Sequence, residues 1–254
     1  MAFVDIHAHL DYDSFDLDRE HLVNLMEKEK IQVFSNTVSY ENYLYTKSLF
    51  KNNKNIFVCP GLYPQNAEVI SDDDFDKYLN FLRTNANEFL AIGEVGLDKY
   101  HTKDEDLFQI QINRFKSLIE LGIELNKPLI VHTRSAEKIV LDIVEYYVNT
   151  YNFRKFDLHC FMGKKKLIKK IISLKIYCSI PMILLNNSSF QYLVEQLPIR
   201  YILTETDSPF LHPQKERNSS LNIPIIIKKI AEIKGLDEKE VENILYLNYL
   251  KFIN

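Results

Sequence analysis

Residues 128–161 read PLIVHTRSAEKIVLDIVEYYVNTYNFRKFDLHCF. Pro128–His132 is a short apolar run typical of a buried strand, and Glu137–Val148 carries apolar residues at helical spacing. Phe156–Cys160 is a second strand-like run. A strand, a helix and another strand within about 30 residues indicate two parallel strands covered by the connecting helix. This segment therefore predicts an α/β fold.

The same alternation extends from this segment to both ends of the chain. We expect strands over Phe3–His7, Ile31–Val38, Ile56–Leu62, Phe89–Glu94, Pro128–His132, Phe156–Cys160, Ile176–Ile180 and Tyr201–Thr206. We expect helices over Asp18–Lys28, Tyr40–Phe50, Ser71 to about Asn85, Leu107–Leu125, Glu137–Val148, a stretch ending near Leu174, Asn187–Gln196, Pro224–Lys234 and Asp237–Phe252. Eight such units without a linker predict a (β/α)₈ TIM barrel as one domain over residues 1–254, with an open doubly wound sheet as the alternative.

Composition limits the class of protein. The 254 residues contain 31 Lys plus Arg and 35 Asp plus Glu, and the net charge of −4 excludes a globally basic nucleic-acid-binding protein. The three cysteines form no CxxC pair, and the N-terminus has no signal-peptide pattern. The longest nearly apolar stretch, Tyr177–Leu185, is far shorter than the ~20 residues of a spanning helix. We therefore expect a cytoplasmic protein without a membrane segment.

Polar residues of one kind gather at the ends of the predicted strands. Four histidines and two carboxylates lie there: His7, His9, Glu94, His132, His159 and Asp207. In a barrel, the carboxyl ends of all strands meet at one face, where active sites are built. Imidazole and carboxylate groups are common metal ligands. The six residues therefore predict a metal site.

The spacing and chemistry of these residues suggest how they act. His7 and His9 lie on one side of an extended segment and can chelate one cation, and Glu94 has two oxygens that can bridge two. His132 and His159 would serve the second ion. We predict two divalent ions, with Glu94 and Asp207 as catalytic groups and Asp207 moving the proton of the attacking water. Imidazoles favour Zn, whereas carboxylate and phosphate ligands favour Mg or Mn.

Each of these residues also has an ordinary interpretation. An HxH pair is often incidental, and a histidine that ends a strand, such as His132 or His159, is usually a packing residue. Glu94 could cap the next helix, and Asp207 beside Ser208-Pro209 could be a turn or N-cap residue. Their joint placement on one face is what these interpretations leave unexplained.

Positive charge follows the sixth strand. Lys164, Lys165 and Lys166 open a predicted helix, where the helix dipole disfavours cations. Arg134 and Arg217 are predicted near the same rim. A phosphate-bearing substrate would explain the cluster, although a solvated helix face is the ordinary alternative. Four aspartates in the first loop make the face mixed in charge. The predicted substrate-binding residues are Arg134, Tyr63, Lys164 and Arg217.

Five motifs assemble these residues in a known order. They are DIHAHLD, IGEVGLD, FQIQINRFKSLIELGIELNKPLIVHTR, LHCFMG and LTETDSPFL. Together they resemble the TatD family of metal-dependent hydrolases from Val4 to about Asn218. The resemblance implies an amidohydrolase-type barrel, divalent metal and, as in many members, deoxyribonuclease activity. It also implies that the six residues above are metal ligands and Asp207 the base.

The third strand departs from the family pattern. TatD proteins usually have Gly-x-His-Pro-His there, whereas residues 61–65 read Gly-Leu-Tyr-Pro-Gln. Tyr63 replaces a histidine expected to help hold the substrate. We expect a metal-dependent deoxyribonuclease that cleaves DNA, with single strands trimmed from an end, and no obligate protein partner. A deacylase acting on an ester or amide such as aminoacyl-tRNA is the alternative, and a nucleic-acid-binding barrel with little catalysis is a further one.

Overall fold

The computed structural model describes residues 2–254. Its eight strands are β1 (Phe3–Ala8), β2 (Ile31–Asn36), β3 (Ile56–Cys59), β4 (Ile92–Gly96), β5 (Leu129–His132), β6 (Phe156–Leu158), β7 (Tyr177–Ile180) and β8 (Ile202–Thr204). Each overlaps one of the eight predicted strands. The largest difference is at β4, which begins three residues later than predicted and continues to Gly96.

The strands are parallel and lie in sequence order. β1 to β3 form one hydrogen-bonded sheet, and β4 to β8 form another. Backbone hydrogen bonds join the two sheets at both junctions: Leu62 N–H donates to the carbonyl of Glu94 at 3.0 Å, and Asp207 N–H donates to the carbonyl of His7 at 2.8 Å. The chain is a (β/α)₈ barrel, as the sequence predicts, and the open sheet is wrong.

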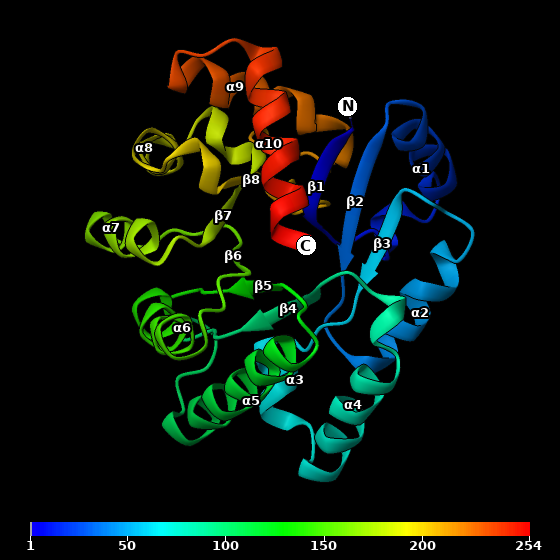
Figure 1. Cartoon of the computed structure of the whole chain (residues 1–254). Coiled ribbons are helices and arrows are strands. Elements are labelled where there is room, and N and C mark those ends of the chain that lie inside the picture. The colour runs from blue at the N-terminus through cyan, green and yellow to red at the C-terminus, as the bar shows by residue number, and fades with distance from the viewer. Residues whose placement is uncertain (1) are drawn as a thin grey trace.

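Helices surround the strands (Figure 1). They are α1 (Arg19–Lys28), α2 (Tyr40–Phe50), α3 (Pro64–Val69), α4 (Asp72–Thr84), α5 (Glu105–Glu124), α6 (Glu137–Tyr151), α7 (Lys165–Leu174), α8 (Ser188–Gln196), α9 (Ile223–Lys234) and α10 (Glu238–Ile253). Short 3₁₀ turns are η1 (Asp13–Phe15), η2 (Ala86–Glu88), η3 (Met182–Leu185), η4 (Ile199–Tyr201) and η5 (Ser220–Asn222). The helix α3 was not predicted, because its first residue is a proline that signals a turn as readily as a helix start.

The chain ends on a helix that crosses one end of the barrel. Figure 1 shows α10 passing over the strands near β1 and β8. Its Tyr249 and Phe252 are buried in one cluster with Val4 of β1, Phe34 of β2 and Leu203 of β8. Phe252 also meets Tyr177, the first residue of β7, at 5.4 Å between ring centroids. The helix therefore closes the end at which the strands begin.

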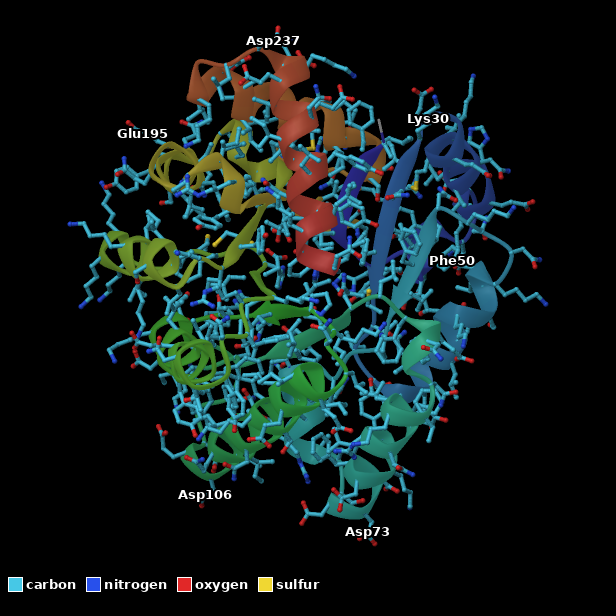
Figure 2. All side chains as sticks on the ribbon, viewed as in Figure 1. Lys30, Phe50, Asp73, Asp106, Glu195 and Asp237 are labelled. Atoms are coloured by element: carbon cyan, nitrogen blue, oxygen red, sulfur yellow. The ribbon has the colours of Figure 1, made fainter. Side chains whose placement is uncertain are left out.

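Many charged side chains lie on the outside of the molecule. In Figure 2, Asp73, Asp106 and Asp237 lie at the outer ends of their helices. Within residues 2–254, no helix is long and apolar enough to cross a membrane.

Candidate metal centre

The structure brings the six predicted metal ligands together at the carboxyl ends of the strands. They come from β1, β4, β5 and the segments that directly follow β1, β6 and β8. All of them except Asp207 are less than one-tenth exposed. They form two groups of converging donor atoms: His7 with His9 and Asp207, and His7 with Glu94 and His159.

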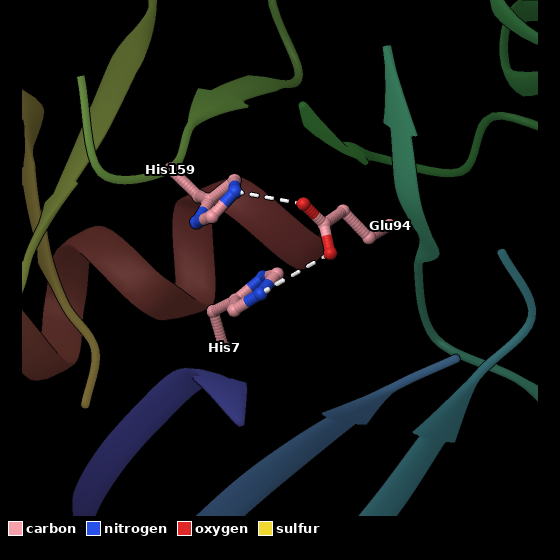
Figure 3. A group of neighbouring side chains, drawn as sticks. All are labelled: His7, Glu94 and His159. Atoms are coloured by element: carbon pink, nitrogen blue, oxygen red, sulfur yellow. Dashed lines mark hydrogen bonds and ion pairs between the residues drawn. The ribbon is translucent and has the colours of Figure 1, made fainter. Parts of the chain in front are cut away.

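The carboxylate of Glu94 lies between two pairs of histidines. Its Oε1 is 2.7 Å from His132 Nδ1 and 2.9 Å from His159 Nε2. Its Oε2 lies 3.7 Å from His7 Nε2 and 3.6 Å from His9 Nε2. Figure 3 shows His159 and His7 on opposite oxygens of Glu94. One carboxylate therefore contacts both halves of the centre.

Asp207 faces His7 and His9. Its Oδ1 is 3.5 Å from His7 Nε2 and 3.6 Å from His9 Nε2. Its backbone is left-handed, with φ 54°, a conformation that aspartate and asparagine tolerate better than most residues. The backbone bond to His7 holds it there. The closure of the barrel between β8 and β1 thus places this carboxylate.

Side chains outside the ligand set orient the imidazoles. His9 Nδ1 is 3.0 Å from the carbonyl oxygen of Asn36, which can only accept, so the ring proton lies on Nδ1 and Nε2 presents a lone pair. His132 Nε2 is 3.1 Å from Asp98 Oδ2. Such outer hydrogen bonds fix the tautomer and direction of a metal-binding imidazole.

Glu205 supports the centre from behind His159. Its Oε2 lies 3.6 Å from His159 Nδ1, and its two oxygens accept from Cys160 N–H and Ser179 Oγ, each at 2.8 Å. Asp98 and Glu205 were not predicted as partners of the candidate ligands. Both had a local signal, since Asp98 ends the IGEVGLD motif and Glu205 lies within TETDSP.

Two glycines allow the strands to approach each other at the centre. A Cβ on Gly61 would lie 2.0 Å from the carbonyl oxygen of Thr37 and 2.3 Å from the nitrogen of Glu94. A Cβ on Gly93 would lie 2.5 Å from Asn36 Oδ1. Only glycine fits such contacts without moving the backbone. Gly61 and Gly93 therefore set the position of Glu94.

Burial and neighbouring charges act in opposite directions here. Burial raises the pKa of the Asp207 carboxyl to about 7. Burial also acts to raise the pKa of Glu94, but His159 and His132 hold that pKa well below its usual value. Burial and His159 lower the pKa of His7 well below its usual value, so this ring is neutral. Neutral imidazole and ionised carboxylate are the forms that bind metal.

The four predicted substrate-binding residues lie in three different places. Arg134 lines a cavity of about 360 Å³ together with His132, His159 and Asp207, and its guanidinium lies 4.1 Å from the ring centroid of Tyr100. Tyr63 is half-buried, donates to Asp98 Oδ2 at 3.3 Å and packs edge-on against His132. Both side chains therefore border the centre.

The other two lie farther out. Lys164 is exposed and precedes α7, where it lines a separate groove. Arg217 pairs with Asp18, with Nη1 at 2.7 Å from Oδ1, and lies over the ring of Phe15. Its guanidinium thus connects the loop after β8 to the loop before α1.

Comparison with known proteins identifies the family of the chain. The profile of the family described as TatD related DNase matches residues 4–254. The chain belongs to the TatD family. This TatD protein is 33% identical to an uncharacterized metal-dependent hydrolase of Methanocaldococcus jannaschii, over 99% of this chain and 97% of the other. It is 29% identical to deoxyribonuclease TATDN3 of Homo sapiens, over 99% and 94% of the two chains.

A solved structure supports the fold. A TatD homologue from Escherichia coli covers 99% of this TatD protein with 98% of its own chain, at a TM-score of 0.87 and 20% identity. The chain is therefore a metal-dependent hydrolase of the TatD family, with the barrel fold of its relatives.

The donor set fits a bound cation. His7 Nε2 and His9 Nε2 lie 3.2 Å apart, and His132 Nδ1 and His159 Nε2 lie 3.3 Å apart. Nitrogen lone pairs brought this close repel each other unless a proton or a metal ion lies between them. The buried carboxylate of Glu94 supplies negative charge to both pairs. Imidazole nitrogens with carboxylate oxygens are a usual ligand set for Zn, and carboxylates also suit Mn or Mg.

Proposed function

We propose that this TatD protein is a deoxyribonuclease that hydrolyses phosphodiester bonds of DNA, with single strands as its substrate and two divalent ions as cofactors. The observation that carries the proposal is Glu94, whose two carboxylate oxygens each face a separate pair of histidines beneath a cavity that Arg134 borders. The family description and the name of the human relative support DNA as the substrate.

The residues divide the work as follows. His7, His9 and Asp207 would hold one ion, and Glu94, His132 and His159 the second, with Glu94 contacting both. Divalent ions at such a centre polarise the phosphate and activate water. Asp207 is the group that accepts the proton, because it is the least buried carboxylate of the centre and borders the cavity. Arg134 offers a planar cation to a phosphate oxygen at the mouth.

The first experiment is cleavage of an end-labelled single strand with Mg²⁺, Mn²⁺ or Zn²⁺. We expect metal-dependent products from the wild type and a loss of at least about a hundredfold in Asp207→Asn, the scale of a lost general base. Asparagine preserves the left-handed backbone at this position, so the fold should survive. Asp76→Asn on the exposed side of α4 is the matched control and should cleave like the wild type.

Either of two results would contradict the proposal. The first, undiminished cleavage by Asp207→Asn, would overturn the role of Asp207 as the proton acceptor. The second is a folded, metal-loaded wild type that leaves DNA intact. An aminoacyl ester should be assayed in parallel, because Tyr63 alters the family pattern beside His132 and activated water can also attack a carbonyl. Ester cleavage without DNA cleavage would replace the phosphodiesterase with the deacylase.

A further inference from the structure

A groove lies between α7 and α8, beside the metal centre. It has a volume of about 730 Å³. Its floor contains apolar side chains, among them Phe161, Ile168 and Leu193, and its walls contain Lys164, Lys165 and Tyr192. Met162 lines both this groove and the cavity over the metal centre. The groove therefore continues from the mouth of the cavity along the outside of the barrel.

Exposed lysines gather at the start of α7. Lys164, Lys165, Lys166 and Lys169 are all exposed, and none is in an ion pair within residues 2–254. Nitrogen-tipped side chains project from the outer side of α7 in Figure 2. The acidic residue that lines the groove is Glu195, which is exposed on α8 (Figure 2). A chain with net charge −4 thus keeps a local cationic surface beside its proposed active site.

One of these lysines is held in place. Lys165 Nζ lies 4.0 Å from the ring centroid of Tyr192 across the groove. A cation over a tyrosine face is stabilised by the ring quadrupole. This contact limits the freedom of a side chain that otherwise loses much entropy when it binds an anion. Tyr192 therefore keeps an ammonium group at the wall of the groove.

The N-terminal end of α7 has no acidic residue in its first turn to balance its positive charge. Among residues 2–254, no side chain caps the N-terminus of α7. Its positive end instead carries lysines, an arrangement that the helix dipole disfavours in the free protein. An anion in the groove would offset both unfavourable features. A chain of phosphates meets this requirement along the length of the groove.

We propose that the α7–α8 groove binds the phosphates of a DNA single strand whose end lies at the metal centre. This inference rests on the proposed deoxyribonuclease function and adds a second binding region to it. Lys164 and Lys165 contact the backbone, and the apolar floor accommodates sugar or base surface. The continuity through Met162 lets one strand occupy both regions. The groove thus makes binding depend on strand length.

Binding of a fluorescein-labelled 12-nucleotide oligothymidylate in EDTA tests the groove, since a metal-dependent hydrolase does not cleave there. On single strands, each neutralised phosphate contributes about −0.7 to the slope of log K against log[salt]. The double variant Lys164→Gln/Lys165→Gln should therefore lose about 1.4 of that slope and bind roughly tenfold more weakly at about 0.15 M salt. A dinucleotide should lose far less affinity than the longer strand.

The matched control is Lys28→Gln/Lys51→Gln, which removes the same charge from exposed lysines at the ends of α1 and α2. This control should keep the wild-type slope and affinity. Equal slopes in the two double variants would overturn the groove, even if the wild type cleaves DNA. Conversely, binding with the expected slope but no cleavage under any metal would support the groove and contradict the nuclease. The two proposals therefore fail separately.

Discussion

Tyr63 occupies a position at which TatD proteins usually have histidine, and it reaches the metal centre through Asp98. Its hydroxyl and His132 Nε2 both hydrogen-bond the same Asp98 oxygen, and His101 Nδ1 is 2.8 Å from that oxygen. The His132 and His101 contacts hold the pKa of Asp98 below its usual value although burial acts to raise it. Asp98 is therefore a charged acceptor that keeps the His132 proton on Nε2, with Nδ1 directed at Glu94.

Asp98→Asn tests this arrangement. Asparagine can still accept from His132, but it removes the negative charge that makes the imidazole a better ligand. We expect metal affinity to fall by about 10- to 100-fold, with little change in the unfolding midpoint. Equilibrium dialysis with Zn²⁺ or Mn²⁺ measures the affinity. Asp76→Asn is again the control, and equal metal affinity in both variants would show that Asp98 does not support the centre.

The sequence predicted the convergence of the six candidate ligands but not their partners. His7 and His9 are separated by one residue, and the other candidate ligands lie on or after β4, β5, β6 and β8, so the parallel order of the strands brings them to one face. The bond from Tyr63 to Asp98 joins residues 35 positions apart. This bond depends on how far the loops after β3 and β4 extend from the strands. The periodicity of apolar residues in the sequence does not determine that distance. The roles of Arg134, Lys164 and Arg217 stay predictions.

At the scale of the elements, the junction of β3 and β4 depends on close backbone contact. Gly61 lies against Thr37 and Glu94 with no room for a Cβ, and Gly93 N–H donates to the carbonyl of Pro60 at 2.9 Å. Neither junction of the barrel is a long ladder of paired strands. The few hydrogen bonds there have to bring both sheets into register around Glu94.

Gly61→Ala should consequently lower the free energy of unfolding by about 3 kcal/mol, at the upper end for an overpacked interior. Backbone atoms surround the new methyl group and cannot rotate away as a side chain would. Urea denaturation followed by circular dichroism measures the change. Asn52→Ala, in the exposed loop after α2, is the control and should stay within about 0.5 kcal/mol of the wild type. A stability loss below about 1 kcal/mol in Gly61→Ala would show that the junction can relax.

The boundaries of the predicted helices were closer to the observed ones than those of the predicted strands. The helix over Tyr40–Phe50 was predicted with its observed limits, and in the structure the side chain of Ser39 caps it by accepting from Asn42 N–H. β4 was placed too early because Phe89 and Leu90 look like strand residues. In the structure, Lys127 donates to the carbonyl of Phe89, and pairing with β5 begins at Ile92. The pattern of side chains in the sequence does not show at which residue the pairing with β5 begins.

At the scale of the whole molecule, α10 connects the last segment of the chain to the first strands. Tyr249 meets Phe34 of β2 at 5.7 Å between ring centroids, and Phe252 is fully buried. Asn248 donates to the carbonyls of Ile199 and Ile202 next to β8. This helix therefore packs against both the first strands of the chain and the last strand, β8.

Phe252→Ala should lower the free energy of unfolding by about 3–5 kcal/mol, the range for a buried phenylalanine. The cavity forms at the end of the barrel opposite the metal centre, so the folded fraction should still bind metal like the wild type. Leu247→Ala on the same helix is the control, because Leu247 is 51% exposed and should matter little. A loss of metal affinity at conditions where Phe252→Ala is fully folded would show that the two ends are coupled.

Tyr249 and Phe252 close one end of the barrel, and this affects how substrate and product can reach and leave the metal centre. The cavity over the metal centre lies at the other end of the barrel, where Arg134 borders it and Met162 lines both this cavity and the α7–α8 groove. In the proposed nuclease, substrate, water and released nucleotide would all pass through this cavity. For a strand trimmed from its end, each freed nucleotide has to leave before the shortened strand can advance. In the proposed nuclease, the nucleotide would leave and the strand would advance once in each catalytic cycle. A free nucleotide would then compete with the strand for this cavity.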